Sequence, residues 1–136
     1  SSSMGIVVGA AIISDGRLLA AQRAAPAELA GGWEFPGGKV HGGETDEQAL
    51  IRECQEELGV VVSLGERVGG DWPLGDDMVL RVWFATVVAG TPVAREHLAL
   101  RWLAPDELFD VPWLPGDLPV VRRVQQMLPD LLGLSE

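Results

Sequence analysis

The sequence has little of the chemistry on which secreted, membrane-spanning or nucleic-acid-binding proteins depend. It contains one cysteine, Cys54, which cannot form an internal disulfide and so favours a reducing compartment. No apolar run approaches the roughly 18 residues of a membrane span, and we find no charged and apolar leader for secretion. We therefore expect a cytoplasmic protein without a membrane partner. We expect Ser1, Ser2 and Ser3, which precede Met4, to be the remnant of an expression tag.

Basic residues are also scarce. Ten lysines and arginines stand against 20 aspartates and glutamates, which gives a formal net charge of -10. Because nonspecific affinity for nucleic acids comes from clustered Lys and Arg, this balance argues against a partner that is a nucleic-acid polymer. A small polyphosphate could still bind if metal ions neutralised its charge. The length of 136 residues predicts a single domain, which we expect over residues 4–136.

The segments that are present predict strands that alternate with helices. Strands are expected at 5–14, 17–23, 33–35, 60–64, 78–89 and 98–103, with a helix between Thr45 and Gly59, a helical turn at 105–108 and a last helix at 119–128. Loops are expected at 24–32, 69–77 and 110–118, and a tight turn of the backbone at the glycines Gly37, Gly38, Gly42 and Gly43. This alternation favours a mixed sheet between helical layers.

The first of these helices carries an unusual concentration of glutamates. Thr45 begins a capping box and Gly59 is placed to end the helix. At about 100 degrees per residue, Glu53, Glu56 and Glu57 share one arc beside an apolar side that faces the core. Like charges at these spacings destabilise a helix unless a cation lies on them, and magnesium suits carboxylate oxygens and substrate phosphates. A solvated acidic face is the alternative interpretation.

The stretch from Gly37 to Val60 resembles the Nudix box, G-x5-E-x7-R-E-U-x-E-E-x-G-U, in which U is a bulky aliphatic residue. The matching residues are Gly38, Glu44, Arg52, Glu53, Glu56, Glu57, Gly59 and Val60. Cys54 stands where an aliphatic residue is usual, which changes packing volume and not chemistry. The resemblance implies an α/β (α+β) fold of the Nudix type, an α/β/α sandwich with a mixed β-sheet between helices.

The resemblance also implies roles for individual residues. The implied metal ligands, for Mg²⁺ with Mn²⁺ as a substitute, are Glu53, Glu56, Glu57, Glu96 and a carbonyl of Gly37 or Gly38. The implied catalytic set comprises Glu53 as acceptor of a water proton, Arg52 to fix Glu53, Glu44 to stabilise the loop, and Glu96. For Glu96 an ordinary exposed loop glutamate is the alternative.

Three further residues, in or near the box or on the strand before it, are candidates for substrate binding. Arg23 and Lys39 are the expected basic residues for the polyphosphate, although each could equally lie on the surface, and Glu34 is a further substrate-binding candidate. The two histidines, His41 and His97, are isolated in the sequence, and we expect His41 at the surface.

Signatures outside the box narrow the substrate class. Relatives that hydrolyse dinucleoside polyphosphates use a tyrosine after the box, and this chain has no tyrosine. Pro73 lies closer to Gly59 than the proline that ADP-ribose hydrolases tend to have. The flank GGWEFPGGK is the one seen in the MutT-like nucleoside triphosphate group, whose members release pyrophosphate and leave a monophosphate.

Asp117 bears on the choice of nucleobase. In relatives that act on 8-oxo-dGTP an asparagine reads the base at this place, whereas a carboxylate pairs more naturally with the amino group of cytosine. Asp117 could equally cap the last helix. Trp83 or Phe84 could stack on a base, but either could belong to the core.

The leading hypothesis is therefore a magnesium-dependent pyrophosphohydrolase of nucleoside triphosphates, of cytidine type (CTP, dCTP or modified dCTP), that sanitises the nucleotide pool. The first alternative is an 8-oxo-dGTP diphosphatase. Weaker alternatives are an ADP-ribose-type hydrolase and a non-catalytic nucleotide sensor. The sequence leaves open whether the protein is a monomer or a homodimer.

Overall fold

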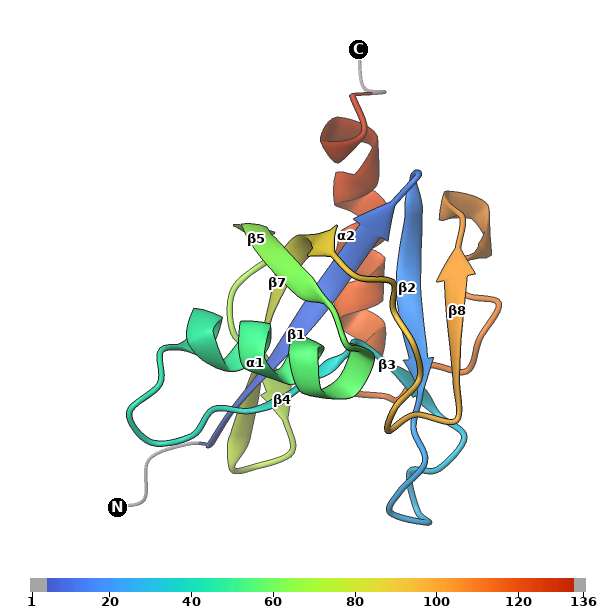
Figure 1. Cartoon of the computed structure of the whole chain (residues 1–136). Helices are drawn as coiled ribbons and strands as arrows, with labels where there is room; N and C mark the ends of the chain where they lie inside the picture. The colour runs from blue at the N-terminus through green and yellow to red at the C-terminus, as the bar shows by residue number, and fades with distance from the viewer. Residues whose placement is uncertain (1–4, 134–136) are drawn as a thin grey trace.

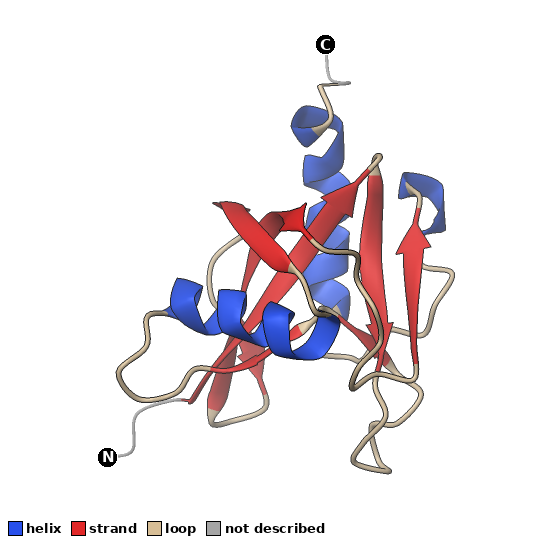
Figure 2. Cartoon of the chain, in the orientation of Figure 1, coloured by secondary structure: helices blue, strands red, loops and turns tan. Residues whose placement is uncertain are grey.

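The computed structural model describes residues 5–133, which form a mixed sheet between two helices (Figure 1). In chain order the elements are β1 (Gly5–Ser14), β2 (Arg17–Gln22), β3 (Trp33–Glu34), β4 (Gly37–Lys39), α1 (Asp46–Leu58), β5 (Val61–Arg67), β6 (Trp72–Leu74), β7 (Met78–Ala89), β8 (Ala99–Leu103), the short 3₁₀ helix η1 (Pro105–Glu107) and α2 (Leu118–Leu131). The predicted α/β/α sandwich is confirmed (Figure 2). The expected tag remnant, Ser1 to Ser3, and both ends of the expected 4–136 domain lie outside the described residues.

Strand β1 is the centre of the sheet. It pairs in parallel with β7 and antiparallel with both β2 and β4, and the strand order along the main path is β3-β2-β1-β7-β5. β8 adds to β2, and β6 adds to β7. Because β1 bonds β4 near its start and β2 near its end, it joins the glycine-rich segment to the rest of the sheet.

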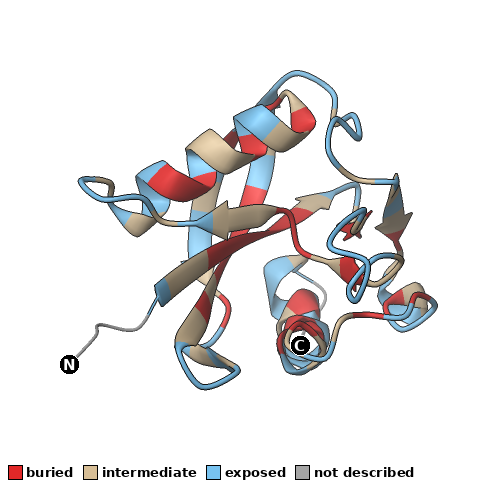
Figure 3. Cartoon of the chain, turned by 90° about the horizontal axis from the view of Figure 1, so that it is seen from below, coloured by how far each residue is buried: buried red, intermediate tan, exposed pale blue. Residues whose placement is uncertain are grey.

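The alternation of side chains along β1 and β7 builds two cores. On one face Val8, Ala10, Ile12, Trp83 and Ala85 pack with the buried residues of α1. On the other face Ala11, Leu80, Val82 and Phe84 pack with Val120, Val121, Val124 and Leu128 of α2. Figure 3 shows the sheet edge-on with one helix on each side. The period of two in each strand therefore decides which helix each side chain meets.

The local signals for α1 are confirmed. The side chain of Thr45 accepts from the backbone N–H of Gln48, and the Gln48 side chain accepts from the N–H of Thr45, which completes the capping box. Gly59 ends the helix in the left-handed region at φ 71°, and its N–H donates to the carbonyl of Gln55. The caps at the two ends set where α1 begins and ends, and therefore which of its residues face the sheet.

The prediction of a tight turn is confirmed at Gly42 and Gly43 but wrong at Gly37 and Gly38, because these two residues lie in strand β4. Gly37 pairs with Gly9 and Gly38 pairs with Val8 of β1. A Cβ atom on Gly37 would collide with the carbonyl oxygen of Val8. Glycine is therefore required here for the close approach of two backbones, and not for a reversal of the chain.

Three other boundaries differ from the predictions. The expected loop at 69–77 contains the strand β6, which pairs with β7. β5 runs to Arg67, beyond the expected end at Leu64. The last helix continues through Pro129 to Leu131, because the N–H of Leu132 still donates to the carbonyl of Leu128 at 2.9 Å. The remaining predicted strands are present, and so is a helical turn at 105–107, within the expected 105–108.

Over residues 5–133, neither helix has the length and apolar content needed to cross a bilayer. The cytoplasmic location expected from the sequence stays a prediction.

The approach of β4 to β1 yields a stability prediction. Gly37→Ala should lower the free energy of unfolding by more than about 2 kcal/mol, since the added methyl group forces the two strands apart. Gly42→Ala is the matched control, because no atom lies within 4 Å of a Cβ built there. Urea denaturation of the two variants measures the difference. Equal stabilities would contradict the account of β4 given above.

Candidate active site

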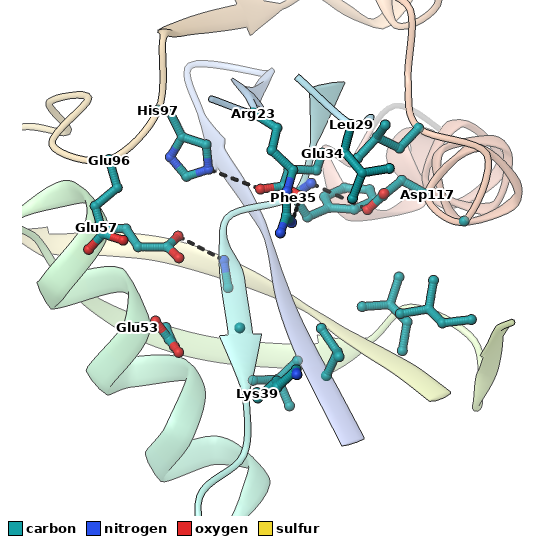
Figure 4. Close-up of a pocket in the computed structure, with 18 of the residues that line it drawn as sticks. Arg23, Leu29, Glu34, Phe35, Lys39, Glu53, Glu57, Glu96, His97 and Asp117 are labelled. Carbon is teal, nitrogen blue, oxygen red and sulfur yellow. Dashed lines mark hydrogen bonds and ion pairs between the residues drawn. The ribbon is translucent and has the colours of Figure 1, made fainter. Parts of the chain in front are cut away.

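A single cavity of about 660 Å³ collects most of the predicted site residues (Figure 4). Its walls come from β1, the segment after β2, β3, β4, α1, the segment before β8 and the residues that precede α2. One end is acidic and contains Glu53, Glu57 and Glu96 with Gly37 and Gly38. The other end is mostly apolar and contains Leu29, Phe35, Leu114 and Asp117, and Glu34 with His97 lies between the ends.

At the acidic end, helix α1 and strand β4 lie against each other. Glu57 accepts a hydrogen bond from the N–H of Gly37 at 3.1 Å. A Cβ atom on Gly38 would collide with the carboxylate of Glu53, so only glycine leaves room for that side chain at the strand. The backbone of β4 and two carboxylates of α1 therefore share one wall of the cavity.

Negative charge on the carboxylates is energetically unfavourable at this wall of the cavity. Burial raises the pKa of Glu57 to about 8, with the carboxylates of Glu53 and Glu34 adding to the shift, while His97 and the Gly37 N–H oppose it. Burial also raises the pKa of Glu53, Arg52 opposes this, and Glu56 and Glu96 add to it. The acidic end therefore favours a proton or a cation among its carboxylates.

Arg52 stabilises the loop before α1 more than it fixes Glu53. Its Nε and Nη2 donate to the two carboxylate oxygens of Glu44 at 2.6 and 3.0 Å, and Nη2 also donates to the carbonyl of Lys39. This pair, with a hydrogen bond from the N–H of His41, lowers the pKa of Glu44 to about 2. The contact from Arg52 Nη1 to Glu53 is longer, at 3.4 Å.

Glu56 is the predicted ligand that the structure leaves outside the cavity. Its side chain is 53% exposed, against 14% for Glu53, and it pairs with Arg52 Nη1 at 3.3 Å. Glu56 is not among the residues that line the cavity. Two of the three predicted ligands on α1 therefore face the cavity, and Glu96 is the third carboxylate of its acidic end.

The donor set suits a hard divalent cation. Carboxylates of Glu53, Glu57 and Glu96 and the carbonyl groups of β4 are the oxygen ligands that Mg²⁺ prefers, and their crowding is what a cation would relieve. Within residues 5–133, no three acidic, histidine or cysteine side chains stand close enough to form a finished ligand set. The chemical nature of these oxygen ligands therefore suits a magnesium ion. The two carboxylates on α1 are the part of the ligand set whose positions a single helix determines.

Between the two ends, Glu34 is held by two donors. Its Oε1 accepts from Arg23 Nη1 at 2.9 Å, and its Oε2 lies 3.1 Å from Nε2 of His97. Burial alone would raise the pKa of Glu34, but the hydrogen bonds from His97 and Arg23 lower it. Glu34 is thus an ionised, fixed acceptor inside the cavity. Arg23, expected at the polyphosphate, lines the cavity and forms an ion pair with Glu34, and its contact with a phosphate stays a prediction.

Asp117 lies at the N-cap position of α2, but its side chain does not cap the helix. Its Oδ1 accepts from the N–H of Phe35 at 3.4 Å, and the residue is 9% exposed on the cavity wall. Burial raises the pKa of Asp117 to about 7, with Glu34 adding to the shift. Phe35 packs against Trp113 with ring centroids 5.2 Å apart. The interpretation of Asp117 as a helix cap is therefore not supported, and its contact with a base stays a prediction.

The other predicted residues fall into those that line the cavity and those that lie elsewhere. Lys39 lines the cavity, as expected of a polyphosphate contact. Trp83 does not line it: the side chain is buried in the core under α1, with Arg67 5.1 Å from its ring centroid. Phe84 is buried on the opposite face. Both aromatic residues are therefore core residues, and stacking on a base by Trp83 is not supported. His41 is exposed, as predicted.

No pattern in the sequence predicts that His97 lies in the site. Its side chain is 5% exposed and contacts Glu34, a residue 63 positions away in the chain. Its only local signal is that it follows Glu96. The contact depends on how the segment before β8 folds across β2, which a local pattern does not contain.

Comparison with known proteins supplies a family and relatives. The NUDIX domain model matches residues 4–124. "Putative 8-oxo-dGTP diphosphatase 2" of Mycobacterium tuberculosis is 49% identical over 115 residues, which cover 82% of each chain. "CTP pyrophosphohydrolase" of Escherichia coli is 43% identical over 118 residues, 85% of this chain and 87% of its own. The solution structure of the E. coli ORF135 protein superposes with a TM-score of 0.78 at 38% identity, over 92% of this chain and 91% of its own.

The buried carboxylates predict how stability depends on pH. The folded state holds a proton on Glu57 up to about pH 8, while the unfolded chain releases it near the ordinary value of 4.5. The free energy of unfolding of the metal-free protein should therefore fall as the pH rises from about 5 to about 8, and Asp117 acts in the same direction.

Glu57→Gln should reduce the loss of unfolding free energy over this pH range, because the amide does not ionise. Glu28→Gln, a change at an exposed loop glutamate, should leave the fall unchanged. Urea denaturation in EDTA at several pH values measures both variants. A wild-type protein whose stability does not change over this window would show that Glu57 is not held in a protonated state.

Proposed function

The chain belongs to the Nudix hydrolase family, and on that premise we propose that it hydrolyses nucleoside triphosphates to a monophosphate and pyrophosphate. The observation that carries the proposal is the cavity that joins an acidic end, suited to a metal and a diphosphate, to an apolar end with two carboxylate acceptors. The printed names of the relatives, a CTP pyrophosphohydrolase and an 8-oxo-dGTP diphosphatase, support the same reaction type.

Glu53, Glu57 and Glu96, with a carbonyl of Gly37 or Gly38, would hold Mg²⁺, with Mn²⁺ as a substitute. When bound, such a cation withdraws charge from phosphoryl oxygens and lowers the pKa of a coordinated water. Burial of Glu53 raises its pKa, which suits a carboxylate that accepts a proton from an attacking water, at the oxygen Oε1 that faces away from the Arg52 contact.

The other groups of the acidic end orient these carboxylates and the substrate. The Gly37 N–H holds Glu57 against β4, and the Glu44 pair with Arg52 stabilises the loop that leads into α1. Lys39, on the cavity wall beside them, is placed to contact a phosphate oxygen. Burial of Glu57 strengthens its contact with the Gly37 N–H relative to water.

The apolar end favours a cytosine. Phe35, supported by Trp113, offers a face for a base, and the carboxylates of Asp117 and Glu34 accept hydrogen bonds from an exocyclic amino group. The substrate proposed first is therefore CTP, dCTP or a modified dCTP, in a role of nucleotide-pool sanitation. The 43% identity to a CTP pyrophosphohydrolase supports this choice.

The second candidate is 8-oxo-dGTP. The 49% identity to a relative named for that activity supports it, and so does the pKa of Asp117 near 7, because a protonated carboxyl group can donate to a purine carbonyl. The same cavity and the same acidic end would serve both substrates.

The proposal predicts a metal-dependent reaction that two carboxylates control. With MgCl₂, the wild-type protein should convert a cytidine triphosphate to monophosphate and pyrophosphate, and Glu53→Gln or Glu57→Gln should each lower kcat by at least about a hundredfold. Chromatography of the products with a pyrophosphate assay measures both. Glu28→Gln, at an exposed loop residue, should retain wild-type rates. Full activity in both glutamine variants would overturn the assignment of the acidic end.

A second prediction concerns the base. Asp117→Asn should shift the ratio of kcat/KM toward 8-oxo-dGTP and away from dCTP and 5-methyl-dCTP by about tenfold or more, because the amide can donate as well as accept. The three nucleotides are compared in one enzyme preparation, so the ratio does not depend on the active fraction. A uniform change for all three would mean that Asp117 does not contact the base.

A further inference from the structure

The segment that carries Glu96 and His97 crosses from α1 to β2. We define the bridge segment as residues 93–98. Its backbone N–H groups donate to α1 at one end, Val93 to Leu58 and Arg95 to Glu57, and to β2 at the other, Leu98 to Gln22, over 2.9 to 3.2 Å. The Arg95 guanidinium also donates to the carbonyl of Gln55 and packs on Gly59. The backbone and Arg95 therefore fasten this segment without help from the His97 side chain.

The His97 side chain makes a different contact. Its imidazole is 5% exposed and its Nε2 lies 3.1 Å from Oε2 of Glu34, while Arg23 holds Oε1 of the same carboxylate. The Arg23 side chain is 38% exposed, so it is a long and solvated donor that loses entropy when it is held still. The short buried ring has little freedom to lose. Of the two donors, His97 therefore holds the carboxylate of Glu34 more effectively in one orientation.

The orientation of Glu34 matters because of where it lies. It separates the acidic end of the cavity from the end that contains Phe35 and Asp117 (Figure 4). With one donor on each oxygen, the plane of the carboxylate is set, and so is the direction in which its remaining lone pairs accept from a ligand. A buried acceptor that is well placed discriminates strongly against a base that lacks the matching donor.

We propose that His97 is a positioning residue that sets nucleobase selectivity by fixing the carboxylate of Glu34. The inference rests on the proposed function, because it takes the ligand to be a nucleotide whose base occupies the Phe35 end. It extends that function by assigning selectivity to a side chain of the bridge segment that itself contacts Glu34 and not the base.

The test compares dCTP with dUTP, which replaces the amino donor by a carbonyl oxygen. His97→Ala should lower the ratio of kcat/KM for dCTP over dUTP by roughly tenfold, mainly through a higher KM for dCTP. His97→Gln should largely restore the ratio, since its amide N–H can take the place of Nε2–H. His41→Ala is the matched control at the exposed histidine and should leave the ratio unchanged. A loss of folded protein does not move this ratio.

A second measurement needs no turnover. Calorimetric titration in EDTA should show wild-type protein binding dCMP more tightly than dUMP, with the difference reduced in His97→Ala and retained in His97→Gln. This readout separates an effect on the base from an effect on the acidic end.

The outcomes distinguish the inference from the proposed function. A wild-type protein that hydrolyses no triphosphate overturns the proposed function, and the inference with it. A wild-type protein that hydrolyses triphosphates overturns only the inference in two cases. The first is an equal preference for dCTP and dUTP, and the second is a His97→Ala variant that loses activity on both in the same proportion.

Discussion

The repulsion between carboxylates on one wall is the constraint on which the rest of the site depends. Glu53 and Glu57 project from α1, Glu96 comes from the bridge segment, and Glu34 comes from β3, so three separate parts of the chain bring like charges to one cavity. Burial raises the pKa of Glu53 and of Glu57, and the neighbouring carboxylates raise them further. Without a cation nearby, turning the side chains outward would relieve this crowding.

The sheet keeps the crowded carboxylates together, because it fixes the backbone on both sides of the cavity wall. β1 holds β4 so closely that glycine is required at Gly37, and β4 in turn offers an N–H to Glu57. α1 is pinned by its capping box at one end and by Gly59 at the other, with its apolar side in the core. The position of the carboxylates therefore follows from packing and backbone pairing, and the electrostatic cost is carried by the stability of the sheet.

Sequence reasoning succeeded where the signal was local. The capping box at Thr45, the end of α1 at Gly59 and the whole of β7 depend on propensities and spacings within a few residues. It failed where two distant segments decide the outcome. Gly37 and Gly38 form a strand only because β1 lies beside them, and Trp83 turns away from the ligand because β7 presents it to α1.

The same distinction applies within the site. The spacing of Glu53 and Glu57 along a helix predicted that they would lie together, and they do. Spacing alone placed Glu56 with them, but the direction of its side chain is set by Arg52, whose other contacts reach the loop before the helix. His97 was missed because its partner, Glu34, lies on a strand that no pattern connects to it. Contacts between side chains that are far apart in the chain are therefore the part of the site that a single sequence does not predict.

The two ends of the cavity are not independent. β3 and β4 are consecutive strands, so only Phe35 and Pro36 lie between Glu34 and Gly37, and the N–H of Phe35 donates to Asp117. The bridge segment makes a second link, since it bonds to α1 near Glu57 and brings His97 to Glu34. A base that moves Glu34 would therefore act on both links to the acidic end. In the proposed reaction these short connections would link the choice of base to the placement of the diphosphate.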